Sequence, residues 1–217
     1  MSWINKDTEI YCSFAKKAGN TGSQMMNTAF YYYGLNKIYK SFSVDSIDQA
    51  VSAVKTLNIK GFAITMPYKR EVLDYVDHLD ESAKIGAANT VINENGILKA
   101  YNTDYYAARL KLENYCDSEL FILGNGGYST AVQAAAKSLS MDFHVITRND
   151  WAKIPEIENS VIYNCTPVEN IHEIIKNNNH FIDCIVSTKT GKELATIQAS
   201  YQFKLYTGLD FPIGVIK

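Results

Sequence analysis

A lysine stands shortly after the apolar run Gly61–Ile64 in the segment GFAITMPYK, residues 61–69, with a threonine and a proline between them. α/β folds bind ligands where their parallel strands end, so the Lys69 amine is placed where it can act as an acid or a base. Pro67 disfavours helical geometry at Met66 and suits the first turn of a following helix, which fixes the direction of Lys69. A solvated lysine at an ordinary helix start is the alternative interpretation, and this motif alone leaves both open.

A glycine-rich turn, Gly124-Asn125-Gly126-Gly127, separates an apolar run from an alanine-rich segment. Glycines between a strand and a helix let the backbone approach a pyrophosphate, and the helix start offers N–H groups and the positive end of its dipole. The turn therefore predicts a dinucleotide site, and Tyr128, the next residue, is included among its candidate residues. A tight turn that binds no ligand is the alternative.

The next predicted strand ends in Thr147-Arg148-Asn149, and these residues discriminate between the nicotinamide cofactors. A carboxylate at this place would accept a hydrogen bond from the ribose 2′-hydroxyl of NAD, whereas an arginine can hold the 2′-phosphate of NADP. The sequence therefore favours NADP. A solvated surface arginine is the alternative, and Asp150 lies close enough in the sequence to complicate the assignment.

Strand-like and helix-like segments alternate along the chain and would position these motifs. The predicted strands cover residues 8–14, 38–44, 59–65, 120–123, 143–149, 160–166 and 181–187, with a further hairpin around Asn95-Gly96. The predicted helices cover residues 22–33, 46–57, 70–79, 104–113, the segment after the glycine turn and 191–206. Ser46 and Gln49 form a capping box at the second helix, whose apolar stripe extends to Leu57. This alternation predicts an α/β fold with a mostly parallel sheet.

Composition excludes several classes of function. The 217 residues are 47% hydrophobic and 20% charged with a net charge of −2, which is typical of a soluble globular protein and offers no basic surface for a nucleic acid. The four cysteines and four histidines are scattered, so we expect no metal site and a reducing cytoplasm. We find neither a signal-peptide pattern nor an apolar stretch of about 18 residues, so no membrane span is expected.

Seven motifs stand in the order and at the spacing of the shikimate dehydrogenase family, which the chain resembles over about residues 8 to 208. They read ITMPYK (64–69), GAANT (86–90), AYNTD (100–104), GNGG (124–127), TRN (147–149), NCTP (164–167) and QA (198–199). The resemblance implies reduction of the ketone of 3-dehydroshikimate with NADPH, in the chorismate pathway of aromatic amino acid biosynthesis.

The resemblance also implies roles for single residues. Lys69 would exchange a proton with the carbonyl oxygen, and Asp104 would hold both the lysine and a substrate hydroxyl. The other matched positions are Thr65, Asn89 and Gln198 at the hydroxyls of the substrate ring, Asn164 and Thr166 in a loop beside the cofactor, and Gly191 near the nicotinamide. A polyhydroxylated substrate needs such a cluster, because each buried hydroxyl left without a partner costs about 1–3 kcal/mol.

The family resemblance further implies two α/β lobes. Residues 1–104 and 191–217 would form the substrate-binding and catalytic lobe, and residues 105–190 a reduced Rossmann-like lobe that binds NADP. Only about a dozen residues separate Arg148 from the next predicted strand, which leaves no room for a full crossover helix. The usual C-terminal helix is expected to be missing or vestigial. Either this trimming weakens cofactor binding, or a homodimer contact compensates for it.

One departure from the family concerns the substrate carboxylate. The family holds it with a Ser-x-Ser before a helix, and the matching positions are Asn20 and Gly22 with Thr21 between them. Asn20, Thr21 and the N–H groups of the helix start can still hold an anion. A dehydrogenase of quinate, aminoshikimate or another ring acid, or a catalytically silent nucleotide-binding homologue, is therefore the alternative to a shikimate dehydrogenase.

Overall fold

The computed structural model describes residues 4–215 and contains two compact units, Met1–Thr103 with Gln198–Lys217, and Asp104–Ile197. The second boundary lies inside one continuous helix, α5 (Lys189–Thr207), rather than before residue 191. The reason is packing: Leu194 belongs to the core of the second unit, whereas Ala199 and Phe203 belong to a core of the first.

The first unit is built on a six-stranded sheet with the order β2-β1-β3-β5-β6-β4. Its strands are β1 (Glu9–Ala15), β2 (Lys37–Ser43), β3 (Gly61–Ile64), β4 (His78–Leu79), β5 (Thr90–Glu94) and β6 (Ile97–Tyr101). The strands β2, β1 and β3 are parallel, but β5 and β6 run antiparallel to their neighbours, so the sheet is mixed rather than mostly parallel. The Asn95-Gly96 hairpin reverses the chain, and both of its residues have the positive φ that such a turn needs, 56° and 92°.

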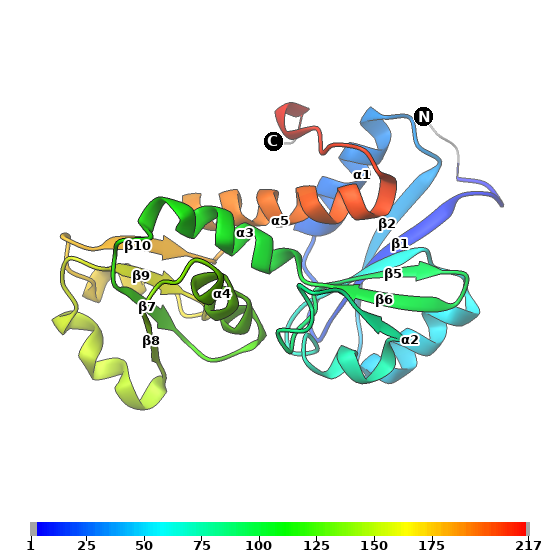
Figure 1. Ribbon diagram of the computed structural model, residues 1–217. Coiled ribbons are helices and arrows are strands. Elements are labelled where there is room, and N and C mark those ends of the chain that lie inside the picture. Colours follow the sequence, from blue (N-terminus) through cyan, green and yellow to red (C-terminus); the bar gives the residue numbers. More distant parts are fainter. Residues whose placement is uncertain (1–3, 216–217) are drawn as a thin grey trace. The chain divides into compact units, whose positions relative to one another are not determined.

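Helices cover both faces of this sheet (Figure 1). On one face, α2 (Ile47–Thr56) packs its buried stripe against β1 and β3, and Ser46 caps it by accepting a hydrogen bond from Gln49 N at 3.3 Å, as predicted. On the other face lie α1 (Thr21–Tyr32) and the second part of α5. Leu57, the predicted end of the α2 stripe, is 64% exposed because the helix stops one residue earlier.

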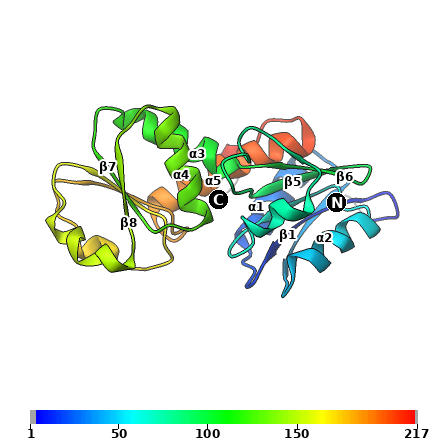
Figure 2. The same ribbon diagram turned by 60° about the horizontal axis from the view of Figure 1, so that its bottom comes forward.

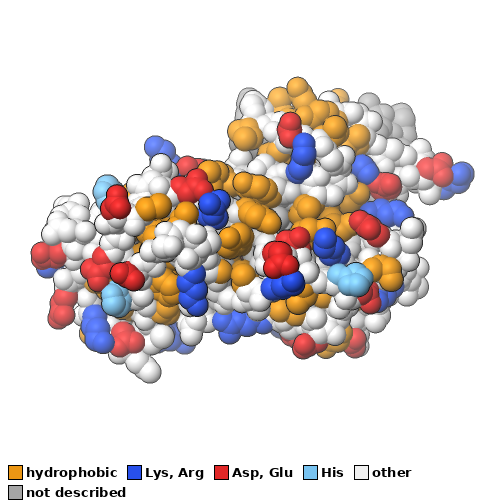
Figure 3. Space-filling view, viewed as in Figure 1, with side chains coloured by type: hydrophobic (Ala, Val, Ile, Leu, Met, Phe, Trp, Pro, Cys, Tyr) orange, Lys and Arg blue, Asp and Glu red, His pale blue; other side chains and the backbone are white. Residues whose placement is uncertain are grey.

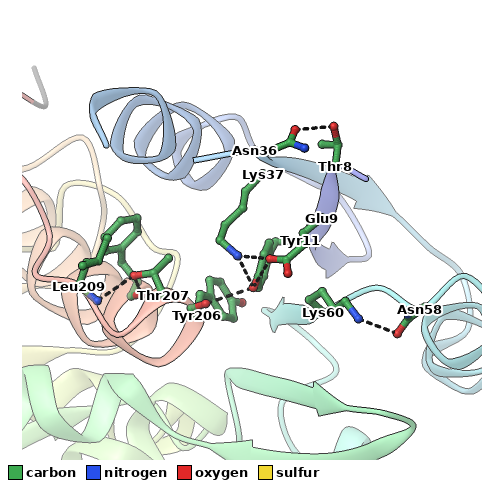
Figure 4. A network of polar contacts seen from close by, with 11 residues as sticks. Thr8, Glu9, Tyr11, Asn36, Lys37, Asn58, Lys60, Tyr206, Thr207 and Leu209 are labelled. Atoms are coloured by element: carbon green, nitrogen blue, oxygen red, sulfur yellow. Dashed lines mark hydrogen bonds and ion pairs between the residues drawn. The ribbon is translucent and has the colours of Figure 1, made fainter. Parts of the chain in front are cut away.

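The second part of α5 is seated by an aromatic row across the sheet. Tyr11 pairs with Gly61 in the register of β1 and β3, and a Cβ on Gly61 would stand 2.7 Å from the Tyr206 ring. Tyr206 therefore fills the space above Gly61, and the Tyr11 hydroxyl donates to the Tyr206 carbonyl oxygen at 3.1 Å. Lys37 and Glu9, which form an ion pair, lie beside the Tyr11 hydroxyl (Figure 4). This packing fixes α5 and thereby the position of Gln198.

The prediction of a helix over residues 70–79 was wrong. Only Glu71–Tyr75 is helical, as a 3-10 turn, and the chain then becomes the short strand β4. The edge of β6 supplies the competing partner, since Asp77 N donates to Leu98 O at 2.9 Å and Leu98 N donates to the Asp77 carboxylate at 2.7 Å. The local apolar spacing suggested a helix, but pairing with β6, which is distant in the sequence, makes the end of this segment a strand.

The second unit is a Rossmann-like layer with four parallel strands in the order β10-β9-β7-β8. The strands are β7 (Leu120–Leu123), β8 (Phe143–Ile146), β9 (Val161–Asn164) and β10 (His180–Asp183). One face carries α3 (Thr103–Leu112), α4 (Gly127–Ser138) and the first part of α5 (Figure 2). Lys111 of α3 and Glu193 of α5 form an ion pair at 2.8 Å.

The other face of this sheet is covered by 3-10 turns at Arg148–Glu156 and Ile171–Ile174. As the short spacing predicted, no full crossover α-helix lies between β8 and β9. The first turn is anchored in the core by the buried Ile154, and the partly buried Trp151 packs against the same cluster. Two further 3-10 turns are Glu113–Tyr115 and Ile213–Val215.

The surface adds two observations on the classes of function considered above. Across residues 4–215 we find no helix of the length and apolarity that a membrane crossing requires. On the face drawn in Figure 3, lysines and arginines are interspersed with aspartates and glutamates rather than gathered in one patch.

Candidate active site

The carboxyl ends of β1, β2 and β3 share one edge of the six-stranded sheet, and β5 begins at the same edge. Thr65 directly follows β3, and its N–H donates to Phe14 O at 3.1 Å. Asn89 directly precedes β5, and its carbonyl accepts from Ile64 N at 2.8 Å. Two of the predicted substrate-binding residues therefore stand close together, at adjoining ends of two neighbouring strands.

Lys69 lies in the turn that leaves this edge. Its carbonyl oxygen accepts from Ala88 N at 2.8 Å, so its backbone is held beside the residue that precedes Asn89. Tyr68 is buried and its hydroxyl donates to Val44 O at 2.7 Å, and this hydrogen bond anchors the turn to the segment after β2. The Met66–Pro67 peptide is cis, and Pro67 does not open a helix as expected, because the 3-10 turn begins only at Glu71. Lys69 itself is half-buried.

Asn89, Thr103 and Gln198 form one hydrogen-bonded network at the same edge. The Asn89 side-chain NH₂ donates to Thr103 Oγ1 at 3.0 Å and to Gln198 Oε1 at 3.3 Å. The Asn89 amide oxygen accepts from Thr103 N at 2.8 Å, and Thr103 Oγ1 lies 3.1 Å from Gln198 Oε1. Asn89 and Thr103 are buried, so these bonds fix the orientation of the amides. Sequence reasoning did not single out Thr103, although it stands in the AYNTD motif.

The start of α1 presents a row of serine hydroxyls that sequence reasoning missed. The Ser23 and Ser41 hydroxyls are 2.6 Å apart, and Ser13 Oγ donates to Ser41 Oγ at 3.0 Å. The three residues come from α1, β2 and β1, so only strand pairing and helix packing bring them together. The predicted Asn20 and Thr21 are exposed at the same helix end, and the Asn20 side chain makes no capping hydrogen bond.

Asp104 belongs to the other unit, as the second residue of α3, and is 5% exposed. Burial raises the pKa values of Tyr128 and Tyr163, and the negative charge of Asp104 contributes to the rise. Because Lys69 and Asp104 are placed in different units, their pairing stays a prediction.

The glycine turn lies at the carboxyl end of β7, where the strand order of the parallel sheet reverses. Gly124 has a φ of 97°, and its N–H donates to Ile146 O at 2.8 Å. Gly126 is the N-cap residue of α4, Gly127 its first residue, and nothing lies within 4 Å of a Cβ built on Gly126. Asn125 is exposed. The hydroxyl of Tyr128 is 3.0 Å from that of Tyr163, and a contact of Tyr128 with a cofactor stays a prediction.

Asn164 and Thr166 shape the loop after β9. The amide oxygen of the fully buried Asn164 accepts from Thr166 N at 2.9 Å and from Thr166 Oγ1 at 2.7 Å, and its NH₂ donates to Asp183 at 3.0 Å. A Cβ on Gly124 would stand 2.7 Å from Thr166 Cγ2. Asn164 is therefore a positioning residue that holds Thr166 against the glycine turn.

In the loop after β8, Asp150 and Arg148 have different surroundings. The Asp150 carboxylate accepts from Thr147 Oγ1 at 3.0 Å and from Lys153 Nζ at 2.9 Å, and these contacts lower its pKa. Arg148 is exposed, and among residues 4–215 its guanidinium has no hydrogen-bond or ion-pair partner. Asn149 is exposed as well. The three candidate residues of this loop thus stand at the same sheet edge as the glycine turn.

Gly191 lies in the first turn of α5 and has a packing role. A Cβ at this position would overlap the Ile185 carbonyl group. The Gly191 N–H donates to Thr188 Oγ1 at 3.1 Å, which caps the helix. The sequence match placed Gly191 near the nicotinamide, and that role stays a prediction.

No metal centre accompanies these residues. Within the described part of the chain, no three side chains of His, Cys, Asp or Glu meet in a way that could hold a metal ion. A shallow hollow of about 570 Å³ lies at the amino ends of β7 and β8, lined by Glu119, Asp142 and His144 among others, and it contains none of the predicted site residues.

Comparison with known proteins identifies relatives of the chain. Residues 18–91 match the model of the shikimate dehydrogenase substrate binding domain. A shikimate dehydrogenase (NADP⁺) of Caldanaerobacter subterraneus is 31% identical over an alignment that covers 94% of each chain. A shikimate dehydrogenase-like protein of Haemophilus influenzae is 38% identical over 139 residues, a match that spans 62% of this chain and about half, 51%, of that relative.

Solved structures share the whole fold. A shikimate 5-dehydrogenase-like protein superposes with a TM-score of 0.84 at 27% identity, covering 99% of this chain and 97% of the other. A shikimate dehydrogenase solved in complex with NADP⁺ superposes with a TM-score of 0.79 at 26% identity, covering 99% and 95%.

Proposed function

The chain belongs to the shikimate dehydrogenase family, and we propose that it interconverts 3-dehydroshikimate and shikimate with NADP(H). One observation carries the substrate half of this proposal. Thr65, Lys69, Asn89 and Gln198 are far apart in the sequence, yet all four stand at one edge of the first unit's sheet. An amine beside a set of amide and hydroxyl groups is what a polyhydroxylated ketone needs.

Lys69 is proposed to donate a proton to the carbonyl oxygen during reduction and to accept it back in the reverse direction. Asp104 is proposed to orient the ammonium group and to accept a hydrogen bond from a substrate hydroxyl. Thr65, Asn89 and Gln198 would bind further ring hydroxyls, with Thr103 as a positioning residue for both amides. A general acid of this kind contributes about 10²–10⁴-fold to the rate.

The residues of the second unit fit NADP. The backbone of Gly124–Gly127 and the start of α4 would hold the pyrophosphate, since the space beside Gly126 is open. Arg148 would bind the 2′-phosphate with Thr147 and Asn149 beside it, because its guanidinium has no partner among the described residues whereas Asp150 is engaged by Thr147 and Lys153. Thr166 and Gly191 would line the remaining part of the site. When bound, NADPH supplies the hydride.

A second candidate is a dehydrogenase of a related ring acid, such as quinate or aminoshikimate. It is favoured by the start of α1, where Asn20 and Gly22 replace the family's two serines and the Ser13–Ser41–Ser23 row stands beside them. A subsite with a different arrangement of hydroxyls would suit a ring acid with different substituents.

The test is a turnover assay with the full chain, in which the absorbance of the reduced cofactor is followed. The substrates are shikimate, quinate and aminoshikimate, and each is assayed with NADP and with NAD. We expect turnover of shikimate with NADP, a loss of about 10²–10⁴-fold in kcat for Lys69→Ala, and no loss for Lys84→Ala, whose side chain only pairs with Glu81 at the surface. Turnover of quinate or aminoshikimate alone would move the assignment to the second candidate. A protein that binds NADP but turns over no ring acid would reduce the proposal to a nucleotide-binding homologue.

A further inference from the structure

Two cysteines stand side by side at the carboxyl edge of the Rossmann-like sheet. Cys165 directly follows β9 and Cys184 directly follows β10. The register of these parallel strands pairs Asn164 with Asp183, so the next pair along the two chains is Cys165 with Cys184. Both are half-buried thiols.

The strand ladder continues through this pair. Cys184 N donates to Asn164 O at 3.2 Å, with the same offset as the bond from His180 N to Ser160 O that opens the ladder. Partners across parallel strands lie about 4.8 Å apart and point their side chains to the same face. That spacing falls within the range of about 4.4–6.8 Å between the Cα atoms of a disulfide. Consistently, Cys184 Sγ lies 3.8 Å from the carbonyl oxygen of Thr166, the residue after Cys165.

The other two cysteines differ from this pair. Cys12 is fully buried in the first unit, and burial raises the pKa of its thiol, which keeps it protonated and unreactive. Cys116 is exposed in a 3-10 turn region, where its thiol contacts the carbonyls of Leu112 and Glu113. Cys165 and Cys184 are therefore the only two described cysteines that the strand register makes neighbours.

A bond at Cys165 would act on the predicted cofactor site. Cys165 stands between Asn164, which holds the loop, and Thr166, whose methyl group lies against Gly124. A disulfide needs a specific torsion about the two sulfur atoms, so forming it would shift the loop that carries Thr166. The glycine turn tolerates little movement of Thr166, since the two residues are already in close contact.

We propose that Cys165 and Cys184 form a reversible disulfide that weakens dinucleotide binding at the neighbouring glycine turn; the effect on binding rests on the proposed NADP site. A low-molecular-weight disulfide such as oxidised glutathione is the oxidant. One cysteine thiolate attacks it and releases a first glutathione thiolate, and the second cysteine displaces the other glutathione. The protein loses two protons and two electrons, and the oxidant becomes two thiols.

The test uses the full chain with Cys116→Ser, which removes the exposed thiol. After treatment with oxidised glutathione, a tryptic digest without reductant should contain residues 154–176 joined to residues 177–189, and dithiothreitol should separate them. The joined peptides should be absent from Cys165→Ala and from Cys184→Ala. The dissociation constant for NADP, measured by calorimetry, should rise by about tenfold on oxidation and return on reduction.

Separate glutathione adducts on the two cysteines, without joined peptides, would overturn the proposal. Joined peptides with an unchanged dissociation constant would overturn the effect on binding. If the reduced protein binds no NADP, the cofactor part of the proposed function fails, and the peptide linkage still decides whether the two thiols form a disulfide.

Discussion

The methyl group of Thr166 lies against Gly124, 2.7 Å from the point where a Cβ of Gly124 would stand. The two residues follow β9 and β7, which are neighbouring strands of the parallel sheet. The glycine turn and the Thr166 loop are therefore in direct contact at the point where the strand order reverses, which is where such sheets bind dinucleotides.

Gly124→Ala should lower both stability and nucleotide affinity. The φ of 97° is a backbone conformation that alanine adopts only at a cost, roughly 1–2 kcal/mol, and the new methyl group would also meet Thr166. We expect a fall in Tm of several degrees and at least about tenfold weaker NADP binding.

Two variants separate the causes in this prediction. Gly126→Ala should keep its Tm, because nothing lies within 4 Å of its Cβ. Thr166→Ser in the Gly124→Ala background removes the clashing methyl group and should recover part of the lost Tm. A Gly124→Ala protein as stable as the unmodified chain would contradict the contact on which the argument rests.

Asp150→Asn should increase the preference for NADP over NAD. Asp150 stands two residues after Arg148, and removing its charge should strengthen phosphate binding by about two- to fivefold, the scale of an exposed charge interaction. NAD affinity should not change, and Asp142→Asn, at the opposite end of β8, should change neither.

The pH dependence of this effect follows from the lowered pKa of Asp150. The Lys153 and Thr147 contacts favour the ionised carboxylate, so their contribution is present above the ordinary pKa near 3.8 and is lost only as the pH falls through the lowered value. The difference between Asp150→Asn and the unmodified protein should therefore be the same at about pH 7.5 and pH 8.5, where the 2′-phosphate of NADP, with a second pKa of about 6, is also ionised. A difference that changes between these two pH values would show that another group sets the preference.

Local signals predicted the elements of this fold well, and long-range pairing explains the errors. The N-cap at Ser46, which is one half of the predicted capping box, and the Asn95-Gly96 turn are each decided within a few residues, and both were predicted correctly. The helix predicted over residues 70–79 does not form because the end of this segment pairs with β6 as the strand β4. Local apolar spacing does not reveal this pairing.

The candidate site shows the same limit. Asn89 and Gln198 are 109 residues apart and meet in one network, and only the family motifs indicated that they belong together. Ser13 and Ser41 carried no motif at all, since their contact depends on the register of β1 with β2. Residues whose proximity is created by pairing alone could not be found from a single sequence.

Gly191→Ala should destabilise the protein because of packing rather than cofactor contact. The added methyl group would overlap the Ile185 carbonyl at the start of α5, and overpacking of this kind costs about 1–3 kcal/mol. Urea denaturation followed by circular dichroism should show a lower midpoint with an unchanged slope. Gly19→Ala, with nothing within 4 Å of its Cβ, should unfold at the same midpoint as the unmodified chain. Normal stability combined with lost NADP binding would instead assign Gly191 to the cofactor site.

Asn20→Ser combined with Gly22→Ser should improve the use of shikimate, because it restores the two hydroxyls with which the family holds the substrate carboxylate. The structure has room for them: a Cβ on Gly22 would make ordinary contacts with Tyr39, at 3.8 and 3.9 Å, and Asn20 is exposed. Two hydrogen bonds to a charged group are worth about 1.5–3 kcal/mol each, so KM for shikimate should fall by at least about tenfold. Gly19→Ser, one residue before this pair, should leave KM unchanged. A double variant that instead raises KM for shikimate would contradict this prediction. It would indicate that the Ser13–Ser41–Ser23 row already binds the substrate carboxylate and that the start of α1 is adapted to a different ring acid.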